Sequence, residues 1–410
     1  MGTTADKLNK ILETKKAIRT AINNKGGTLT ETDTFASYAT AIDNIKSGGS
    51  GVGEEKSIYV DFLDGDGTLL KREYLDVGGT ATPPDDPNLD SNYLTFSGWS
   101  DTEFTNITKI KTIYATYTTK DNATYIFIHI PTANKAIMLR FGGTVTSVDW
   151  GDGTTDATLS HTYSATGDYV IKVIGGTSIP TNILNSTNDN AFVLKCYLSN
   201  TIKGLNNAFN QCFSLKSIIL SKDTKVIGPS VFYQCFSLES INLPSTITAI
   251  NSQAFLGCYT LKNISLPSGI TSIGKGAFTN CYLLKNITLP SGVTSLDNTF
   301  YGCYALTNIN ISSSITKLGD NVFAYCHSLS SISLPSSITT LGSATFSSCY
   351  NIQQVIINAN SVVTIQSNSF AKASYGTKFY VPDNLVEDYK VATNWVKFED
   401  RIYPLSSLGV

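Results

Sequence analysis

The sequence predicts a multidomain, mainly β protein with a helical segment at the N-terminus and a solenoid of stacked repeats in the C-terminal half. Three observations predict this class. The chain of 410 residues is longer than a single hydrophobic core usually supports. Its composition, with 31 glycines and only 2 methionines, suits short strands joined by many turns. Cysteines recur at steps of 22 or 23 residues between Cys212 and Cys349, which is typical of a repeat architecture.

Residues 1–46 are expected to form a hairpin of two helices. Apolar residues recur at helical spacing over 8–22 and again over 35–45, and Gly26 separates the two runs. The segment resembles a module of tail and baseplate proteins from phages of Gram-positive hosts, which implies docking to other virion tail or baseplate proteins. A generic oligomerisation hairpin remains the alternative. Residues 47–53 are expected to form a flexible Gly/Ser linker.

Residues 54–118 predict a small β domain. Ile58, Val60 and Phe62 alternate with polar residues and precede an Asp-Gly-Asp-Gly turn, which is typical of a β-hairpin. Together with a Gly-Trp pair ending at Trp99, the segment resembles the β-grasp repeats of the Listeria–Bacteroides type. That resemblance implies a domain of the kind found on bacterial surface proteins.

The same turn also resembles a catalytic motif. Asp64-Gly-Asp66-Gly-Thr68 after an apolar strand matches the nucleophile loop of haloacid-dehalogenase-type phosphatases, in which the two carboxylates act as nucleophile and acid. That chemistry also needs a lysine and further acidic residues around Mg²⁺. The segment after Thr68 has the pattern of a strand, and no matching lysine or acidic motif follows. We therefore expect no catalytic residue here.

Residues 122–176 predict a β-sandwich. The segment resembles a PKD-type immunoglobulin-like domain, whose markers are a Trp-Gly-Asp-Gly turn at Trp150 and a His-Thr-Tyr stretch beginning at His161. Asp149 and Asp152 in this turn are candidate Ca²⁺ ligands. We expect them to cap the turn instead, because aspartate side chains commonly bond the backbone two residues further on.

The C-terminal half repeats one pattern seven times. A phenylalanine lies three residues before each cysteine, a leucine or isoleucine lies three residues after it, and apolar residues follow at six and eight residues after it. The final alternation predicts a short strand. A second apolar pair in most units, such as Ile247 and Ile250, predicts another strand on the opposite side of the coil. One unit alone cannot bury these side chains, so successive units must stack.

The consensus Ala-Phe-x-x-Cys-x-x-Leu-x-x-Ile-x-Leu-Pro resembles the BspA-like leucine-rich repeats. The resemblance covers residues 190–380 and implies a leucine-rich-repeat solenoid. An eighth, degenerate unit has Phe370 but Lys372-Ala373 at the place of the cysteine. Residues 381–410 resemble the closing cap of the family, which an open solenoid needs in order to cover its core.

The repeated cysteines are expected to be structural. A zinc site needs ligands that converge on one point, whereas these cysteines follow a line along the coil. Seven is an odd number for pairing, and Cys196 lies outside the register. We therefore expect a column of buried, reduced thiols, with no metal site and no cofactor.

Two outward surfaces of the repeats contain the candidate ligand-binding residues, because such ladders are the usual binding surface of a solenoid. The first surface consists of two neighbouring columns rich in amides and hydroxyls, which suit a neutral polyol such as a glycan. Its candidates are Asn263, Asn286 and Asn308 in one column and Asn242 and Asn310 in the next. The second follows the cysteines and is aromatic apart from one histidine: Phe213, Phe236, Tyr259, Tyr282, Tyr304, His327 and Tyr350. Aromatic surfaces are favoured at binding patches. Packing between turns at the edge of the core would also explain this column, and both interpretations stay open.

Composition and charge argue against several classes of function. The net charge is −2 and no basic stripe is present, which gives no electrostatic support for nucleic-acid binding. No apolar run is long enough for insertion into a membrane, and no signal peptide is recognisable. A polysaccharide depolymerase would need paired carboxylates on one solenoid face. The few acidic residues of the repeats, including Glu239 and Asp297, lie in different units.

We therefore expect a binding protein and no enzyme. The first hypothesis is a phage tail-fibre or baseplate protein, made in the host cytoplasm and carried on the virion tail, that recognises a host cell-surface glycan or protein through its solenoid. The alternative is a bacterial cell-surface adhesin whose signal peptide is not part of this sequence. Tail fibres are often trimers, so a homotrimer stays open, although the sequence encodes no coiled coil.

Overall fold

The computed structural model describes residues 58–108, 110–184 and 187–408. Residues 58–410 form a compact unit of their own. The helical hairpin expected over 1–46 and the linker expected over 47–53 lie outside the described residues. The described chain is mainly β with little helix, as predicted. Within it, no helix combines the length and the hydrophobicity that crossing a membrane requires.

A four-stranded sheet, called the first sheet below, begins the described chain. Its strands are β1 (Ile58–Leu63), β2 (Leu69–Leu75), β3 (Leu94–Trp99) and β4 (Lys111–Thr119), in the order β2-β1-β4-β3. The central strands β1 and β4 are parallel, and the outer pairs are antiparallel. The predicted alternation holds in β1, where Val60 and Phe62 are fully buried. The segment after Thr68 is a strand, as its pattern predicts.

A second sheet joins the predicted sandwich to the solenoid. It contains β5 (Thr124–Ile130), β7 (Val145–Asp149), β8 (Thr155–Asp156) and β10 (Gly167–Gly175), while β6 (Lys135–Met138) pairs separately with β9 (Ser160–Tyr163). On its other edge, β5 pairs with β12 (Val193–Tyr197), which is parallel to β14 (Ser217–Ile219). The sheet therefore continues from one predicted domain into the next, and its strands cover the N-terminal end of the coil.

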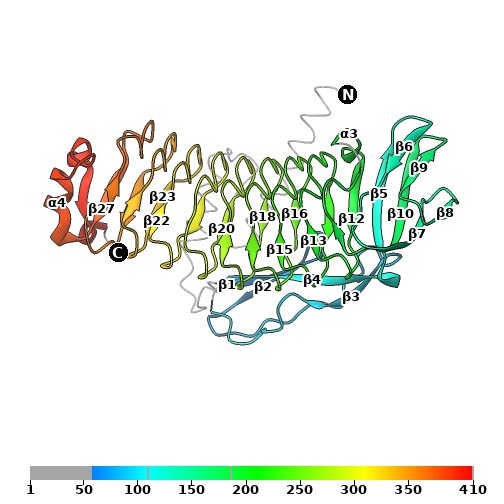
Figure 1. The fold of residues 1–410 in the computed structure, drawn as a ribbon. Helices are drawn as coiled ribbons and strands as arrows, with labels where there is room; N and C mark the ends of the chain where they lie inside the picture. Colours follow the sequence, from blue (N-terminus) through cyan, green and yellow to red (C-terminus); the bar gives the residue numbers. More distant parts are fainter. Residues whose placement is uncertain (1–57, 109, 185–186, 409–410) are drawn as a thin grey trace, which may run out of the picture. The chain divides into compact units, whose positions relative to one another are not determined.

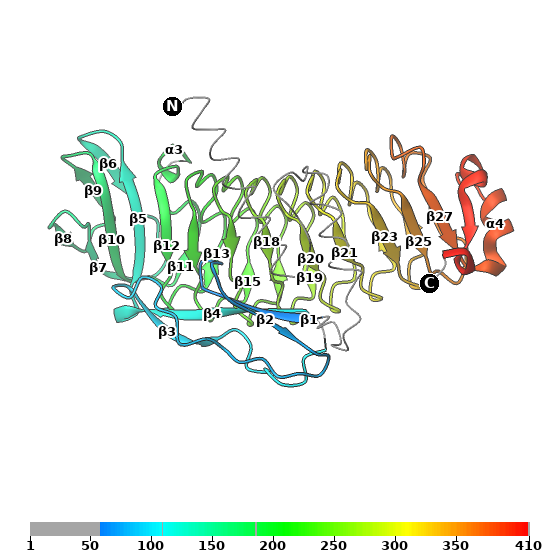
Figure 2. The same ribbon diagram turned by 180° about the vertical axis from the view of Figure 1, so that it is seen from behind.

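Beyond β12 the chain winds into a solenoid of parallel strands (Figure 1), which Figure 2 shows from behind. One ladder, called the front ladder below, comprises β14, β16 (Ser240–Ile241), β18 (Asn263–Ile264), β20 (Asn286–Thr288), β21 (Asn308–Asn310), β23 (Ser331–Leu334), β25 (Gln354–Ile357) and β27 (Lys378–Val381). The second comprises β11 (Ser178–Ile179), β13 (Gly204–Leu205), β15 (Val226–Ile227), β17 (Ala249–Ile250), β19 (Ser272–Ile273), β22 (Lys317–Leu318), β24 (Thr340–Leu341) and β26 (Thr364–Ile365). The predicted stacked coil is confirmed, and a second strand is present in the units except at Leu296, where a single bridge to Leu318 takes its place. Because β11 pairs with β13, the coil begins before residue 190.

A column of phenylalanines fills the centre of the solenoid. These side chains are fully buried, and successive rings stack with centroids 5.2 to 5.7 Å apart: Phe209, Phe232, Phe255, Phe278, Phe300, Phe323 and Phe346. Each ring therefore packs against its own copy in the next turn, as the repeat predicts.

The cysteines form a second internal column. All eight cysteines of the chain are buried and free. From Cys235 onwards, each thiol in the register donates a hydrogen bond to the backbone carbonyl of the phenylalanine one unit earlier. Cys235 Sγ, for example, lies 3.1 Å from Phe209 O. Cysteine fits this position because it is a small apolar side chain that still offers one weak donor.

The C-terminal segment closes the last turns. It contains 3₁₀ helices over Asp383–Leu385, Val396–Arg401 and Leu405–Leu408, the helix α4 (Val386–Val391) and β28 (Ile402–Pro404), which pairs with β27. Tyr389 and Trp395 are fully buried, and Trp395 Nε1 donates a hydrogen bond to Val363 O at 2.7 Å. These side chains cover an apolar end that would otherwise face water.

Candidate functional site

The Asp64–Thr68 turn is held by contacts within the fold. Asp64 is buried and accepts hydrogen bonds from the backbone N–H of Gly65 and from the hydroxyl of Tyr117. Asp66 Oδ1 accepts the backbone N–H of Thr68 at 2.9 Å. Burial, and then the hydrogen bond to Asp64, raises the pKa of the Tyr117 hydroxyl. Both carboxylates therefore have partners that stabilise a strand-to-strand turn.

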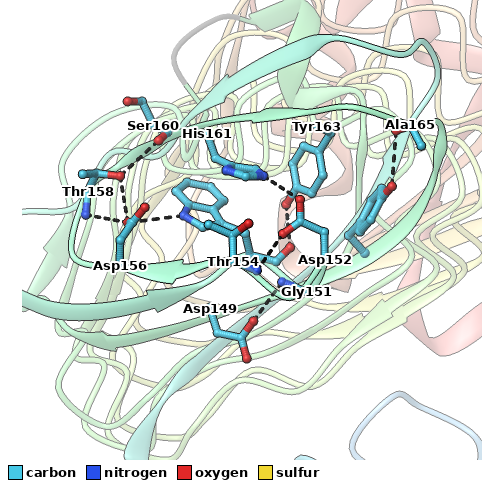
Figure 3. Close-up of polar contacts among 12 residues, drawn as sticks. Asp149, Gly151, Asp152, Thr154, Asp156, Thr158, Ser160, His161, Tyr163 and Ala165 are labelled. Atoms are coloured by element: carbon cyan, nitrogen blue, oxygen red, sulfur yellow. Dashed lines mark hydrogen bonds and ion pairs between the residues drawn. The ribbon is translucent and has the colours of Figure 1, made fainter.

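The turn after Trp150 is held by aspartates (Figure 3). Asp149 Oδ1 accepts the backbone N–H of Gly151 at 2.9 Å, and Asp152 Oδ1 accepts that of Thr154 at 3.0 Å. Both carboxylates therefore cap the turn, as expected. Asp152 Oδ2 also lies 2.7 Å from His161 Nε2.

The packing around Trp150 shows why these polar groups are fixed. Trp150 is fully buried, and the ring of His161 stacks on it with centroids 5.0 Å apart. The hydroxyl of Tyr163 donates a hydrogen bond to Trp150 O at 2.8 Å. Burial alone would raise the pKa of Asp152, but the hydrogen bonds from His161 and from the turn outweigh it and lower this pKa. Across 58–108, 110–184 and 187–408, no group of three His, Cys, Asp or Glu side chains converges as a metal site would require.

Four of the five candidate amides form one continuous surface. Asn263, Asn286, Asn308 and Asn310 are exposed on β18, β20 and β21, which are neighbours in one parallel sheet of the front ladder. Asn286 is paired in register with Asn263 on one side and with Asn308 on the other. This surface is called the amide face below. Its exposed side chains offer hydrogen-bonding groups to solvent, and Asn286 Oδ1 also accepts a hydrogen bond from the Thr307 hydroxyl at 3.4 Å.

The fifth candidate, Asn242, lies under the first sheet. Its Nδ2 atom donates a hydrogen bond to Ala115 O at 3.3 Å, and the neighbouring Ser240 hydroxyl donates one to Asp66 O. In the turn before, Ile219 is buried in a small apolar cluster that includes Tyr117. Asn242 is therefore half-buried and already has a partner, and the open part of the front ladder begins at Asn263.

The aromatic column is a continuous stack of rings. Successive centroids lie 4.5 to 4.9 Å apart, and neighbouring planes differ by at most 16°: Phe213, Phe236, Tyr259, Tyr282, Tyr304, His327 and Tyr350. Each interior ring has both faces covered by its neighbours, so only its edge and polar tip reach solvent. Burial, and then the phenols of Tyr259 and Tyr304, raises the pKa of the Tyr282 hydroxyl. Packing between successive turns therefore explains why the interior positions of this column are aromatic.

The column ends in the degenerate eighth repeat. Gln354 of β25 pairs with Lys378 of β27, so equivalent positions in these two repeats are 24 residues apart. Ser374 is therefore the residue that follows Tyr350 at the aromatic position. Tyr350 is 54% exposed, the largest value in the column. A hollow of about 580 Å³ lies beside it, called the end hollow below and lined by Tyr350, Lys372, Ala373, Ser374, Tyr375 and Gly376. Of these residues, only Tyr350 is among the candidate binding residues predicted from the sequence, and Lys372-Ala373 were noted only as the break in the cysteine register.

Comparison with known proteins identifies the repeats. Residues 200–299 and 296–392 match the BspA type leucine rich repeat region, a family with six copies of the unit. No curated protein matches the chain.

Three solved structures resemble part of the chain. A leucine-rich repeat protein from Bacteroides ovatus is 26% identical, with a TM-score of 0.42, over 51% of this chain and 60% of its own. The leucine rich repeat protein of T. pallidum is 25% identical, with a TM-score of 0.34, over 40% of this chain and 75% of its own. A leucine rich cell surface protein from Faecalibacterium prausnitzii is 19% identical, with a TM-score of 0.25, over 51% of this chain and 83% of its own.

These structural likenesses are partial. The chain spans about 60% of the length of the Bacteroides protein. All three TM-scores lie below 0.5, so they define no common arrangement of the whole molecules. The family match and the observed stacking of the repeats agree, and residues 200–392 of this chain form a BspA type leucine-rich repeat region.

Proposed function

We propose that the chain is a non-catalytic binding protein that recognises a cell-surface glycan through the amide face of its solenoid. The observation that carries this proposal is the in-register row of exposed asparagines at Asn263, Asn286 and Asn308. Each amide offers both a donor and an acceptor, and a polymer of sugar units presents hydroxyl groups that need both. Parallel strands repeat every ~4.8 Å, so the face offers such groups at a regular spacing.

The position of the first sheet supports the same surface. Because Ser240 and Asn242 bond to Asp66 and Ala115, the first turns of the front ladder are covered by the chain itself. Among residues 58–108, 110–184 and 187–408, no segment covers the later turns in this way, and a long ligand can lie along them. A solenoid commonly binds its ligands on a ladder surface of this kind.

Binding of the intact protein to immobilised cell-envelope polysaccharides tests this proposal. The variant with both Asn263→Ala and Asn308→Ala removes exposed amides from the amide face and should weaken binding. Ser272→Ala is the matched control, because Ser272 is exposed on β19 in the other ladder. Absence of binding to every polysaccharide, or equal loss in both variants, would overturn the proposal. A reducing-end assay on each bound polysaccharide tests the non-catalytic part, since release of new ends would show a depolymerase.

The placement of the protein is a separate proposal with two candidates. Residues 1–46 support a phage virion protein that recognises its host, because their sequence resembles a tail and baseplate module; they lie outside the described residues. The BspA type repeat region supports a bacterial surface adhesin. Antibodies against the solenoid, applied to intact phage particles and to intact cells, separate the two. Light scattering of the purified protein tests whether it forms a homotrimer.

The finer domain assignments also stay proposals. A β-grasp fold for residues 54–118 is supported by the strand order β2-β1-β4-β3 with a parallel central pair. A PKD-like fold for residues 122–176 is supported by the buried Trp150 and its stacked partner His161.

A further inference from the structure

We propose that the end hollow binds one pyranose ring of an acidic polysaccharide, with the sugar stacked on the open face of Tyr350. This inference rests on the proposed function, because it names the ligand class and adds a second contact site on the same solenoid.

The geometry of the aromatic column points to a ring-shaped ligand. From Phe213 to Tyr350 every repeat supplies one ring, and the rings stack 4.5 to 4.9 Å apart. In the next repeat the backbone keeps the same turn, since Lys372 has a φ of 56° where Ser348 has 58°. The side chain at the ring position, however, is that of Ser374. One face of Tyr350 stacks on His327, and in the described part of the chain no ring covers its other face.

The chemistry of the lining favours a sugar over a flat apolar ring. The face of a phenol ring is electron-rich and attracts the weakly positive C–H groups on one face of a pyranose. The hydroxyl groups of the sugar then point sideways and need polar partners. The side chain of Ser374 and the 98% exposed side chain of Tyr375 supply hydroxyls at the rim. A volume of about 580 Å³ lies within the range of small-ligand sites.

The charges around the hollow favour an acidic sugar. Lys372 lines the hollow and is exposed, and no carboxylate lies among the lining residues. A second hollow of about 210 Å³ shares the segment from Lys372 to Tyr375 and adds Lys397 and Arg401. Arg401 holds this segment, because its guanidinium donates a hydrogen bond to Tyr375 O at 2.9 Å. An ammonium group at the rim pairs with a carboxylate or phosphate on the ligand.

Three soluble probes, titrated onto the intact protein by calorimetry, separate the contributions of ring and charge. An oligogalacturonate carries both pyranose rings and carboxylates, its methyl ester carries rings without charge, and a polyglycerol phosphate carries charge without rings. We expect the oligogalacturonate to bind most tightly, the methyl ester more weakly and the polyglycerol phosphate weakest. Tightest binding of polyglycerol phosphate would show a plain anion site and overturn the proposal.

Variants of the end hollow complete the test. Tyr350→Ala should weaken oligogalacturonate binding about tenfold, whereas Tyr325→Ala, at an exposed tyrosine one unit earlier, should leave it unchanged. Lys372→Gln should weaken the oligogalacturonate but not its methyl ester, with Lys317→Gln as the exposed control. Ser374→Tyr should block binding by extending the ring stack. This variant gives up only the surface hydrogen bond from the backbone N–H of Gly376 to Ser374 Oγ, and it leaves Tyr350 in place. It therefore also serves if Tyr350→Ala folds poorly.

The outcomes distinguish this site from the proposed function as a whole. If Asn263→Ala with Asn308→Ala reduces polysaccharide binding while the three end-hollow variants do not, the inference is wrong and the amide face stands. If the unaltered protein binds none of the saccharides, both fail. Binding of an aromatic peptide that Ser374→Tyr abolishes, without any binding of oligogalacturonate, would replace the sugar by a protein partner and overturn the inference.

Discussion

The stability of the solenoid should fall as the pH rises above about 7.5, because its thiols are buried. All eight cysteines are buried and free, and burial raises the pKa of their thiols, in the case of Cys349 to about 12. In the unfolded chain the same thiols ionise with a pKa of about 8.5. A group whose pKa is raised by folding stabilises the fold fully below its unfolded pKa. That contribution is lost as the pH rises towards the folded pKa.

The size of the effect follows from the number of thiols. A thiol that stays protonated in the fold and ionises only on unfolding lowers the free energy of unfolding by about 0.35 kcal/mol between pH 7.5 and pH 8.5. For the eight buried thiols together the loss is about 3 kcal/mol over that pH unit. The reference pKa of free histidine lies below this window and those of free tyrosine and lysine lie above it, so thiols are the side chains whose reference pKa falls within reach of the window.

Urea unfolding of the intact protein under a reducing agent, at pH 7.5, 8.0 and 8.5, measures this loss. The double variant Cys258→Ala and Cys281→Ala is the control, and its pH dependence should be smaller by about 0.7 kcal/mol. A free energy of unfolding that stays constant over this range would refute the reasoning, because it would mean that the thiols ionise equally in the folded chain. So would an unchanged pH dependence in the double variant.

Three further predictions concern the packing of the coil. Phe255→Ala should destabilise the protein by about 3–5 kcal/mol in urea unfolding, because the buried ring stacks on both neighbouring phenylalanines; an effect below about 1 kcal/mol would contradict a packed column. Gly274→Ala should lower the melting temperature, since its methyl group would lie 2.4 Å from Ser252 N in the turn before; Gly269→Ala is the control, with its nearest atom at 3.6 Å. Trp395→Ala should expose the end of the coil and increase binding of a hydrophobic dye at pH 7, and unchanged dye binding would show that the cap does not depend on this ring.

The sequence was sufficient to predict the solenoid because each repeat buries the same side chains. Phe255 and Cys258, for example, recur with the same spacing in every unit from Phe209 to Cys349, and only stacking can bury all copies at once. The aromatic column was also visible as a set of positions. Its internal stacking depends on the distance between turns, which follows from strand pairing and not from residue type.

Contacts between segments far apart in the chain could not be predicted from the repeats. The hydrogen bond from Asn242 to Ala115 joins residues 127 positions apart, and the amide of Asn242 resembles those of its neighbours in every respect that the sequence shows. Likewise, the pairing of β5 with β12 depends on edge strands from two predicted domains meeting in space. The end hollow could not be predicted for another reason. It exists because the eighth repeat has Ser374 where the earlier repeats have an aromatic or histidine ring.

Hydrogen–deuterium exchange of the intact protein, with and without the cell-envelope polysaccharide that it binds most tightly, tests the central claim most directly. We propose that the solenoid surface is the recognition element, and this proposal predicts that added polysaccharide slows exchange over residues 263–310 and 371–376 and leaves residues 58–119 unchanged. Slower exchange confined to residues 58–175, with no change along the coil, would contradict the account.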